Sequence, residues 1–250
     1  MSLEEQLRGL HASAPRHVTT ETLLGTGHID GYAVFDSPVG PVTVSFNPGG
    51  VSAVDLADDE SETRFAERFG RRMVPALTPQ GWDTKIGRAI ERGAPADLPV
   101  DFRSVTPFRR SVLEITASIP RGQVRSYGWL ARQVGNDGAV RAVGSTMASN
   151  PVPLIVPCHR VVRTDGAIGN YSLGGPHFKR ALLAHEGTDP MWLESLAQRG
   201  VRYVGSATTR IVCHPTCAHA RRITDRHRVE FHSLEDAATG GFRPCEVCRP

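Results

Sequence analysis

Five cysteines stand in two different settings in this sequence of 250 residues. Four of them form a Cys-x3-Cys pair, Cys213 and Cys217, and a Cys-x2-Cys pair, Cys245 and Cys248. Two cysteines this close together can present both sulfurs from one turn, and outside the secretory pathway such pairs favour a metal over disulfides. The four thiolates predict one tetrahedral, structural zinc ion per chain. The fifth cysteine, Cys158, has no cysteine near it in the sequence.

Histidines near the four cysteines are alternative zinc ligands, because imidazole also binds zinc. These are His214, His219, His227 and His232. We expect them instead to lie on the surface of a basic segment. A module of about 60 residues with few aromatic side chains gains much of its folding free energy from a bound metal.

Cys158 lies between Pro157 and His159. A lone cysteine is most often a small, inert side chain of an apolar core. Here the proline makes the turn rigid, and a neighbouring imidazole is the common means of converting a thiol into a nucleophilic thiolate. The residues around Cys158 therefore favour a nucleophile over simple packing.

Three short helices are predicted before Cys158. Thr106-Pro107 is typical of a helix start, and a helical stripe of apolar side chains follows it. Ser126 is predicted to cap a second helix over residues 127–134, and Asp137 a third over residues 138–149. A glycine-containing turn between the last two helices is typical of a helix-turn-helix.

The third predicted helix has one apolar face and one smooth, polar face. The apolar face consists of Val140, Val143 and Met147, and the opposite face of Arg141, Ala142, Ser145 and Ala148. Helices that read the major groove carry several long polar side chains. A smooth face with one arginine favours close approach to a minor groove, where a side chain can wedge between bases. The alternative is an ordinary helix with a surface arginine.

The first hundred residues contain no group with evident catalytic chemistry, and we expect them to be a scaffold. Strands are predicted over residues 32–35, 42–46 and 51–56, with helices over 3–11, 62–73 and 85–92 and a linker after the first of these helices.

Charge is unevenly distributed along the sequence. Residues 1–100 carry 9 Lys and Arg against 14 Asp and Glu, whereas residues 101–250 carry 20 against 12. Nearly all the cations are arginine, which suits bidentate contacts with phosphate. The distribution favours a polyanion as partner of the last 150 residues. An arginine-rich composition without a partner is the alternative.

Nothing in the sequence points to a membrane. The first residues lack a basic region followed by an apolar run, so we expect no signal peptide. No stretch approaches the roughly 18 uninterrupted apolar residues of a membrane span. We therefore expect a cytoplasmic protein.

Residues 105–188 closely resemble the O6-alkylguanine-DNA alkyltransferases. The segments that carry the resemblance are Ile119–Ala131, Ala139–Val143, Asn150-Pro151, Pro157–Val161, Gly169–Ser172 and Leu182–Gly187. Residues 31–100 match more loosely, where the family has a small α/β domain. The resemblance implies an α/β fold in four parts: an N-terminal extension (1–30), a small RNase H-like α/β domain (31–103), a helix-turn-helix alkyltransferase domain (104–190) and the zinc module (191–250).

The resemblance also implies roles in a methyltransferase reaction. Cys158 would accept the alkyl group and keep it, so each molecule would act once. His159, oriented by Glu186, would remove the thiol proton through a water. Asn150 would brace the turn against the recognition helix, and Tyr127 would donate a proton to the departing guanine.

Other residues of the family pattern would hold the DNA. The implied partner is double-stranded DNA with O6-alkylguanine, bound through its minor groove with the damaged nucleotide flipped out, and no small-molecule cofactor is implied. Arg141 would fill the gap in the duplex, with Ala142 and Ser145 beside it. Tyr171 and Ser172 would line the base pocket. The loop at 173–176 holds one residue more than the commonest family spacing, which leaves the preferred alkyl size open.

The C-terminal cysteines lie in a segment that resembles the zinc-binding domain of the Ada DNA-repair protein. In that domain the first cysteine of the Cys-x3-Cys pair accepts a methyl group from a DNA phosphotriester while it ligates zinc, and the matching residue is Cys213. The module here follows the alkyltransferase domain instead of preceding it, and Arg210 stands where glycine is common. A structural module that grips DNA is therefore the first interpretation, and phosphotriester repair by Cys213 is the alternative.

Two rival functions fit the sequence less well. A DNA-binding protein that senses alkyl lesions without transfer would lack the nucleophile, and Cys158 is present. A zinc-dependent transcription regulator would need a further sequence-reading helix pair, and none is predicted after the recognition helix.

Overall fold

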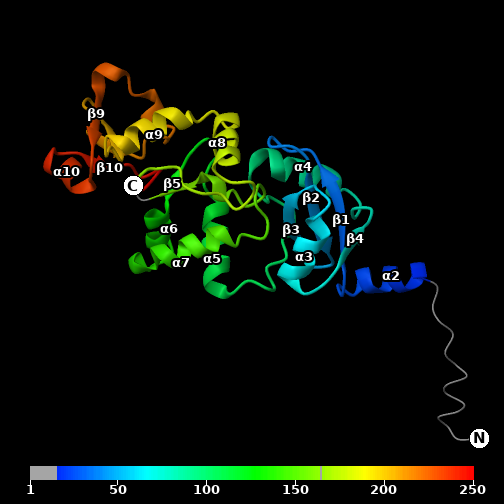
Figure 1. Ribbon diagram of the computed structural model, residues 1–250. Helices are drawn as coiled ribbons and strands as arrows, with labels where there is room; N and C mark the ends of the chain where they lie inside the picture. Colours follow the sequence, from blue (N-terminus) through cyan, green and yellow to red (C-terminus); the bar gives the residue numbers. More distant parts are fainter. Residues whose placement is uncertain (1–15, 164) are drawn as a thin grey trace, which may run out of the picture.

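The computed structural model describes residues 16–163 and 165–250 (Figure 1). The four-stranded sheet of the first part lies at one end of the molecule, helices α5 to α8 lie in the middle, and the C-terminal module lies at the other end. The helix predicted over residues 3–11 lies outside the described residues. No helix among the described residues is long and apolar enough to cross a membrane.

Helix α2 (Arg16–Gly25) occupies a segment for which we predicted a linker. That prediction was wrong. The segment contains several β-branched residues and has no marked apolar stripe, so neither propensity nor periodicity indicates a helix.

The first sheet has the strand order β3-β2-β1-β4. Strands β1 (Asp30–Phe35), β2 (Val42–Asn47) and β3 (Gly50–Leu56) form an antiparallel meander, as predicted. Strand β4 (Met73–Pro75) pairs parallel to β1. Helices α3 (Ser61–Phe69) and α4 (Trp82–Arg92) complete this part.

The predicted helix over residues 62–73 is too long. Helix α3 ends where Gly70 adopts a left-handed conformation, with φ 66°. The chain then turns, and Met73 is buried in the sheet as the first residue of β4. The sequence analysis missed this strand because it has only three residues.

The three predicted helices are present in the helical part, together with a short strand that was not predicted. This part contains α5 (Pro107–Ala117), β5 (Arg125–Ser126), α6 (Tyr127–Gln133) and α7 (Val140–Ala148). Ser126 caps α6 and accepts a hydrogen bond from the Trp129 amide. Asp137, predicted to cap the third helix, instead begins a 3-10 turn, η1 (Asp137–Ala139), and makes no cap bond.

Cys158 lies in a second 3-10 turn, η2 (Cys158–Arg160), which leads into β6 (Val161–Val162). Strand β6 pairs in parallel with β5, so the acceptor turn is held beside the start of α6. Helix α8 (Pro176–His185) follows. One apolar core contains Val44 and Ile86 of the first part together with Leu130, Val143 and Ile155 of the helical part, which fixes the two parts against each other.

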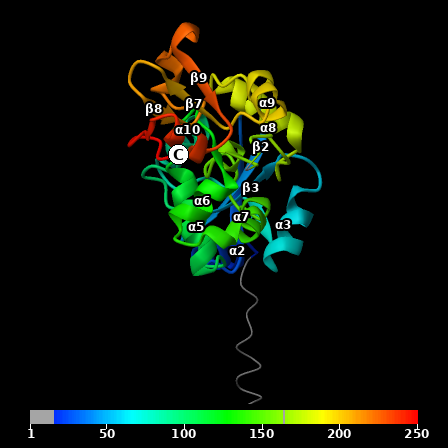
Figure 2. The same cartoon turned by 90° about the vertical axis from the view of Figure 1, so that its left-hand side faces the viewer.

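The C-terminal module has its own small sheet, in the order β10-β8-β7-β9. Its elements are α9 (Pro190–Gln198), β7 (Tyr203–Ser206), β8 (Ile211–Cys213), η3 (Ala220–Arg222), η4 (Asp225–His227), β9 (Arg228–Phe231), α10 (Leu234–Thr239) and β10 (Arg243–Pro244). The C-terminal end of the chain lies next to α6 in both views (Figure 1, Figure 2).

Candidate functional site

The side chain of Cys158 is 97% buried at the wall of an open pocket of about 330 Å³. The other residues that line this pocket are Tyr127, Gly144, Met147, Ala148, Asn170, Tyr171 and Ser172. Three of them belong to α7, so the predicted recognition helix forms one wall. The pocket therefore opens beside the helix that the sequence analysis assigned to DNA.

Asn150 connects the acceptor turn to the end of α7. Its side-chain amide donates to the Cys158 Sγ at 3.1 Å and to the Val156 carbonyl at 2.9 Å. Its Oδ1 accepts from the Val152 amide at 3.1 Å. A side-chain N–H directed at sulfur stabilises a thiolate more than a thiol.

His159 and Glu186 form a buried pair. The His159 Nε2 lies 2.9 Å from Glu186 Oε1. The Arg160 guanidinium also binds this carboxylate, with its Nη2 2.6 Å from the same oxygen. Burial opposes the ionised form of Glu186, but the hydrogen bonds from His159 and Arg160 outweigh it and lower the pKa of Glu186 to about 2. The carboxylate is therefore charged near neutral pH.

The protonation of His159 follows from its surroundings. Burial lowers the pKa of His159, against the opposing effect of Glu186, so the imidazole is neutral near pH 7. A neutral ring that donates from Nε2 to Glu186 keeps the lone pair on Nδ1. Nδ1 is buried and contacts no hydrogen-bonding group of the described chain. This nitrogen is the available proton acceptor.

Lys179 is a functional candidate that the sequence analysis missed. Its side chain is almost fully buried, and its Nζ donates to the Val161 carbonyl at 2.6 Å and to the Asn170 carbonyl at 3.2 Å. Burial lowers the pKa of Lys179 to about 8, against the effect of Cys158. Its position could have drawn attention, because Lys179 precedes the buried Leu182 and Leu183 by three and four residues on one face of α8.

The Cys158 thiol experiences opposing effects. Burial raises its pKa, whereas the Asn150 amide, the charge of Lys179 and the Ser172 hydroxyl act to lower it. An uncompensated buried thiol would be inert. The polar groups around Cys158 are of the kind that favours the thiolate.

Two tyrosines flank the pocket. Tyr127 is half-buried at the first residue of α6, and burial together with the neighbouring Cys158 raises its pKa, so it keeps its proton near neutral pH. Tyr171 is buried, with its ring 6.2 Å from that of His159 and its hydroxyl without a partner among the described residues. Both line the pocket that holds Cys158.

The remaining expected DNA contacts lie on the surface. Arg141, Ala142 and Ser145 are exposed on α7, while Val143 and Met147 of the same helix are buried, as the periodicity predicts. The loop beside the pocket is fixed by glycine: Gly174 has φ +76°, and a Cβ there would collide with the Phe178 ring. A side chain at residue 174 would therefore displace the Phe178 ring beside the pocket.

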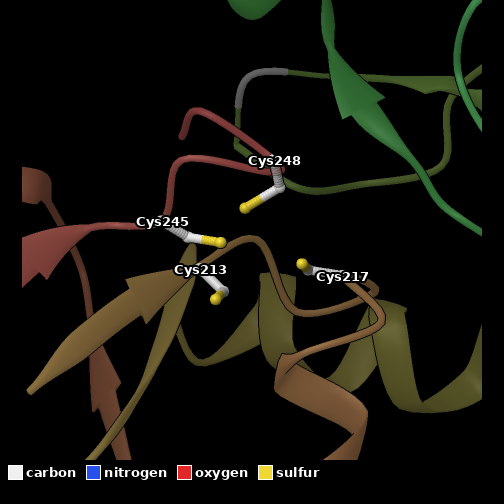
Figure 3. Close-up of side chains that lie close together, drawn as sticks. All are labelled: Cys213, Cys217, Cys245 and Cys248. Atoms are coloured by element: carbon white, nitrogen blue, oxygen red, sulfur yellow. The ribbon is translucent and has the colours of Figure 1, made fainter. Parts of the chain in front are cut away.

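The four C-terminal cysteines converge (Figure 3). Cys213 ends β8, Cys217 lies in the turn after it, and Cys245 and Cys248 lie in the turn after β10. All four are buried, and their sulfurs lie within 4.8 Å of one another. Tetrahedral zinc at about 2.3 Å from each sulfur needs sulfurs about 3.8 Å apart, so the arrangement fits this metal.

The histidines of the module do not join the cluster among the described residues. His219 Nδ1 lies 3.8 Å from the Cys245 Sγ. The expectation of surface positions is wrong for His214, which is buried and packs against the Tyr203 ring at 5.6 Å. The four cysteines are thus the ligand set, and the module holds a structural zinc ion.

Known families match two stretches of the chain. The model of the 6-O-methylguanine DNA methyltransferase DNA-binding domain matches residues 107–188, and that of the metal-binding domain of Ada matches residues 196–250. The methylated-DNA–protein-cysteine methyltransferase of Rattus norvegicus is 49% identical over 189 residues, which are 70% of this chain and 89% of the relative.

Two further proteins are similar to more than half of the chain. The bifunctional transcriptional activator/DNA repair enzyme Ada of Escherichia coli K12 is 35% identical over 151 residues, 57% of this chain and 42% of Ada. The crystal structure of the O6-methylguanine-DNA methyltransferase of Pyrococcus kodakaraensis is similar at a TM-score of 0.52 and 31% identity, over 64% of this chain and 99% of that one. With an alkyl-acceptor pocket and a four-cysteine zinc module in one chain, this protein belongs to the methylated-DNA–protein-cysteine methyltransferase family.

Proposed function

We propose that the chain repairs O6-alkylguanine in duplex DNA by transferring the alkyl group to Cys158, once per molecule. One observation carries this assignment. Cys158 lies at the wall of a pocket under the recognition helix, with its sulfur bonded to Asn150 and a neutral His159 held by Glu186 beside it.

The transfer is a displacement at carbon. The Cys158 proton passes through a bridging water to His159 Nδ1, whose other nitrogen is bound to Glu186. The thiolate attacks the alkyl carbon, a carbon–sulfur bond forms, and the bond from that carbon to guanine O6 breaks. Tyr127 donates its phenol proton to the guanine, which leaves as a neutral base. The thioether is stable, so Cys158 is consumed.

The damaged base must leave the duplex to reach a buried sulfur, which costs a few kcal/mol of unstacking. Arg141 projects from the exposed face of α7 and fills the gap, while Ala142 and Ser145 permit close approach to the minor groove. Tyr171 and Ser172 contact the flipped base. The reaction needs no small-molecule cofactor, because the acceptor is a side chain.

The four parts of the chain divide the work. Residues 104–190 carry out the transfer, residues 31–103 support the acceptor turn, residues 191–250 form the zinc module, and residues 1–30 are an extension. Because its substrate is cellular DNA, we expect the protein to act in the cytoplasm.

The test is to follow the DNA product. The protein is incubated in limiting amounts with a duplex that contains one O6-methylguanine, and the digested DNA is analysed by chromatography. The expected result is one guanine restored per protein molecule. Repeated turnover, or loss of the base instead of its restoration, would contradict the proposal.

A second function is favoured by the surroundings of Cys213. This ligand lines an open pocket of about 460 Å³ whose other walls include Thr208, Arg222, Arg226 and His227. A zinc-bound thiolate in a basic pocket suits a methyl phosphotriester, because four thiolates leave the site negatively charged and the sulfur nucleophilic. Methyl transfer from phosphotriester DNA to Cys213 in a Cys158→Ser background would establish this activity, and its absence would leave the module with a structural role.

Arg210 bears on this second function, because it stands where the Ada segment commonly has glycine. Its backbone has φ 54°, a left-handed conformation that favours glycine. The side chain packs over the Phe242 ring at 5.1 Å and donates to the Gly240 carbonyl at 3.1 Å. These contacts offset the backbone cost, so the module keeps its turn before β8 without glycine.

A further inference from the structure

We propose that the zinc module is a positioning brace for the Cys158 site and that Arg221 is the residue that connects the module to Glu186. This inference rests on the proposed function, since it assigns the module a part in the reaction at Cys158. It does not require that Cys213 react with DNA.

The connection runs through one residue, Gly122. Arg221, in the zinc module, donates from its Nη2 to the carbonyl of Gly122. The Gly122 amide donates to Glu186 Oε2 at 3.0 Å. The Gly122 carbonyl also accepts from the Thr188 hydroxyl at 2.8 Å. Both ends of this residue are therefore held, one by the module and one by the carboxylate of the active site.

Gly122 cannot easily be replaced in this position. Its φ is +71°, and a Cβ would lie 2.7 Å from the Glu186 carbonyl oxygen and 3.0 Å from Arg221 Nη2. The close approach of the two parts thus depends on the missing side chain. Glu186 in turn binds His159 Nε2 at 2.9 Å. Arg221 is consequently linked to the proton acceptor His159 through the backbone of Gly122 and the carboxylate of Glu186.

Further bonds hold the segment that follows Gly122. The Val124 amide donates to the Thr216 hydroxyl at 2.8 Å, and the Trp129 indole donates to the Arg249 carbonyl at 2.8 Å. Thr216 directly precedes the zinc ligand Cys217, and Arg249 directly follows Cys248. The metal site therefore fixes both acceptors.

This segment also leads to the reacting groups. Residues 122–129 contain Tyr127, and strand β5 within them pairs with β6, which directly follows the acceptor turn. Arg125 of β5 is buried, and its guanidinium donates to Gln123 Oε1 at 2.8 Å within the same segment. A shift of the module would thus move the segment that carries the proton donor.

The connection is partly apolar, because Trp192 and Leu193 of α9 pack in one cluster with Val124 and Leu183. The link through Arg221 is a polar contact outside this cluster, so single substitutions can test it. The two apolar clusters within residues 203–242 and around the zinc cysteines consist of module residues alone. Removing Arg221, whose side chain is not part of either cluster, leaves these clusters intact. Positioning contacts of this kind change reaction rates without abolishing the fold.

The experiment compares Arg221→Ala, Arg221→Lys and the control Arg199→Ala in the full-length, zinc-loaded protein. Arg199 pairs with Glu230 on the module surface, 2.6 Å away, so this control also removes one arginine and one ion pair. Two rates are measured: methyl transfer from O6-methylguanine duplex at increasing DNA concentration, and alkylation of Cys158 by iodoacetamide without DNA. Zinc content is measured in every variant.

We expect Arg221→Ala to lower the transfer rate at saturating DNA about 10-fold, with the half-saturating DNA concentration and the zinc content unchanged. Arg221→Lys should restore most of the rate, because an ammonium group also donates to the Gly122 carbonyl. Arg199→Ala should match the wild type.

Equal saturating rates in Arg221→Ala and the wild type would overturn the proposal, as would a change in the half-saturating concentration alone, which would make Arg221 a DNA contact. A wild type that transfers no methyl group would refute the proposed function instead. In that case the iodoacetamide rates still decide: a slower rate in Arg221→Ala supports the brace, and an equal rate overturns it.

Discussion

The five buried cysteines of this chain lie in two different surroundings. Cys158 is alone among the cysteines, and side-chain groups on three other segments act on its sulfur: Asn150, Ser172 and Lys179. Cys213 and its three partners face one another and share a metal. A buried thiol resists ionisation. Hydrogen bonds and a lysine charge oppose this resistance at Cys158, and zinc opposes it at the other four cysteines.

The difference has a consequence for reactivity. Hydrogen bonds and one lysine charge favour a thiolate but leave the sulfur free to form a new bond, beside an open pocket. Zinc ionises its ligands fully but uses their lone pairs to hold the module together. The first setting suits a reaction that consumes the cysteine, and the second suits a structure that must persist.

The largest expected effect is at Cys158 itself. Cys158→Ser should abolish methyl transfer from O6-methylguanine, because a serine hydroxyl is far less ionised than a thiol in the same surroundings. Duplex binding should persist, since the exposed face of α7 is unchanged. Transfer is measured with labelled DNA and binding by fluorescence anisotropy. Transfer at the wild-type rate in this variant would show that Cys158 is not the acceptor and would contradict the proposed difference between Cys158 and the zinc cysteines.

Cys245→Ser should destabilise the zinc module, because it removes one of the four thiolates. With three thiolates the module should lose zinc to a chelator that leaves the wild type loaded, and residues 199–250 should unfold before the rest of the chain. Zinc stoichiometry and hydrogen exchange are the measurements. Transfer to Cys158 should persist at a reduced rate. A zinc content that stays at one per chain would show that another residue completes the site.

Glu186→Gln should lower the transfer rate at pH 7 about 100-fold, because a neutral amide no longer favours the His159 form that accepts a proton. Single-turnover kinetics at saturating DNA measure this. Glu235→Gln, the same change at an exposed carboxylate of α10, is the control. A rate within twofold of the wild type would mean that His159 acts without Glu186.

The same carboxylate should affect acid stability. The pKa of Glu186 in the folded protein is about 2, below its ordinary value of 4.5. Its contribution, about 3 kcal/mol, is therefore complete above pH 4.5 and is lost as the pH falls towards 2. Denaturant unfolding of wild type and Glu186→Gln should differ most above pH 4.5 and converge near pH 2. A difference that is independent of pH would contradict the ionised pair.

The smallest expected effect is at Arg141. Arg141→Ala should slow transfer from duplex DNA about 10-fold, because the gap left by the flipped base is no longer filled. Transfer from the same lesion in single-stranded DNA should be unchanged, since no gap is created there. Equal slowing on both substrates would indicate a role in general DNA affinity instead.

Both cysteine settings were visible in the sequence, for different reasons. Zinc spacing is local, so Cys213 and its partners could be recognised from the chain alone. The partners of Cys158 lie as far apart as Tyr127 and Glu186, and only the resemblance to a family connected them. Strands β1, β2 and β3 of the first sheet followed from alternation and turns.

What the sequence did not predict depends on packing between distant segments. Lys179 is buried by groups from β6 and the loop before α8, so its burial has no local signal beyond its place on an apolar helix face. The bond from Arg221 to Gly122 joins residues 99 positions apart. Strand β4 is too short to show a periodic pattern of apolar residues, and the apolar pattern of α2 is too weak to indicate a helix.

The central claim is that Cys158 alone receives the alkyl group from guanine. The direct measurement is the intact mass of the protein after incubation with a duplex containing O6-methylguanine, followed by peptide mapping. We predict a gain of one methylene group, located on Cys158, in every molecule that has reacted. No gain despite DNA binding, or a gain located on a cysteine of the zinc site, would contradict the account.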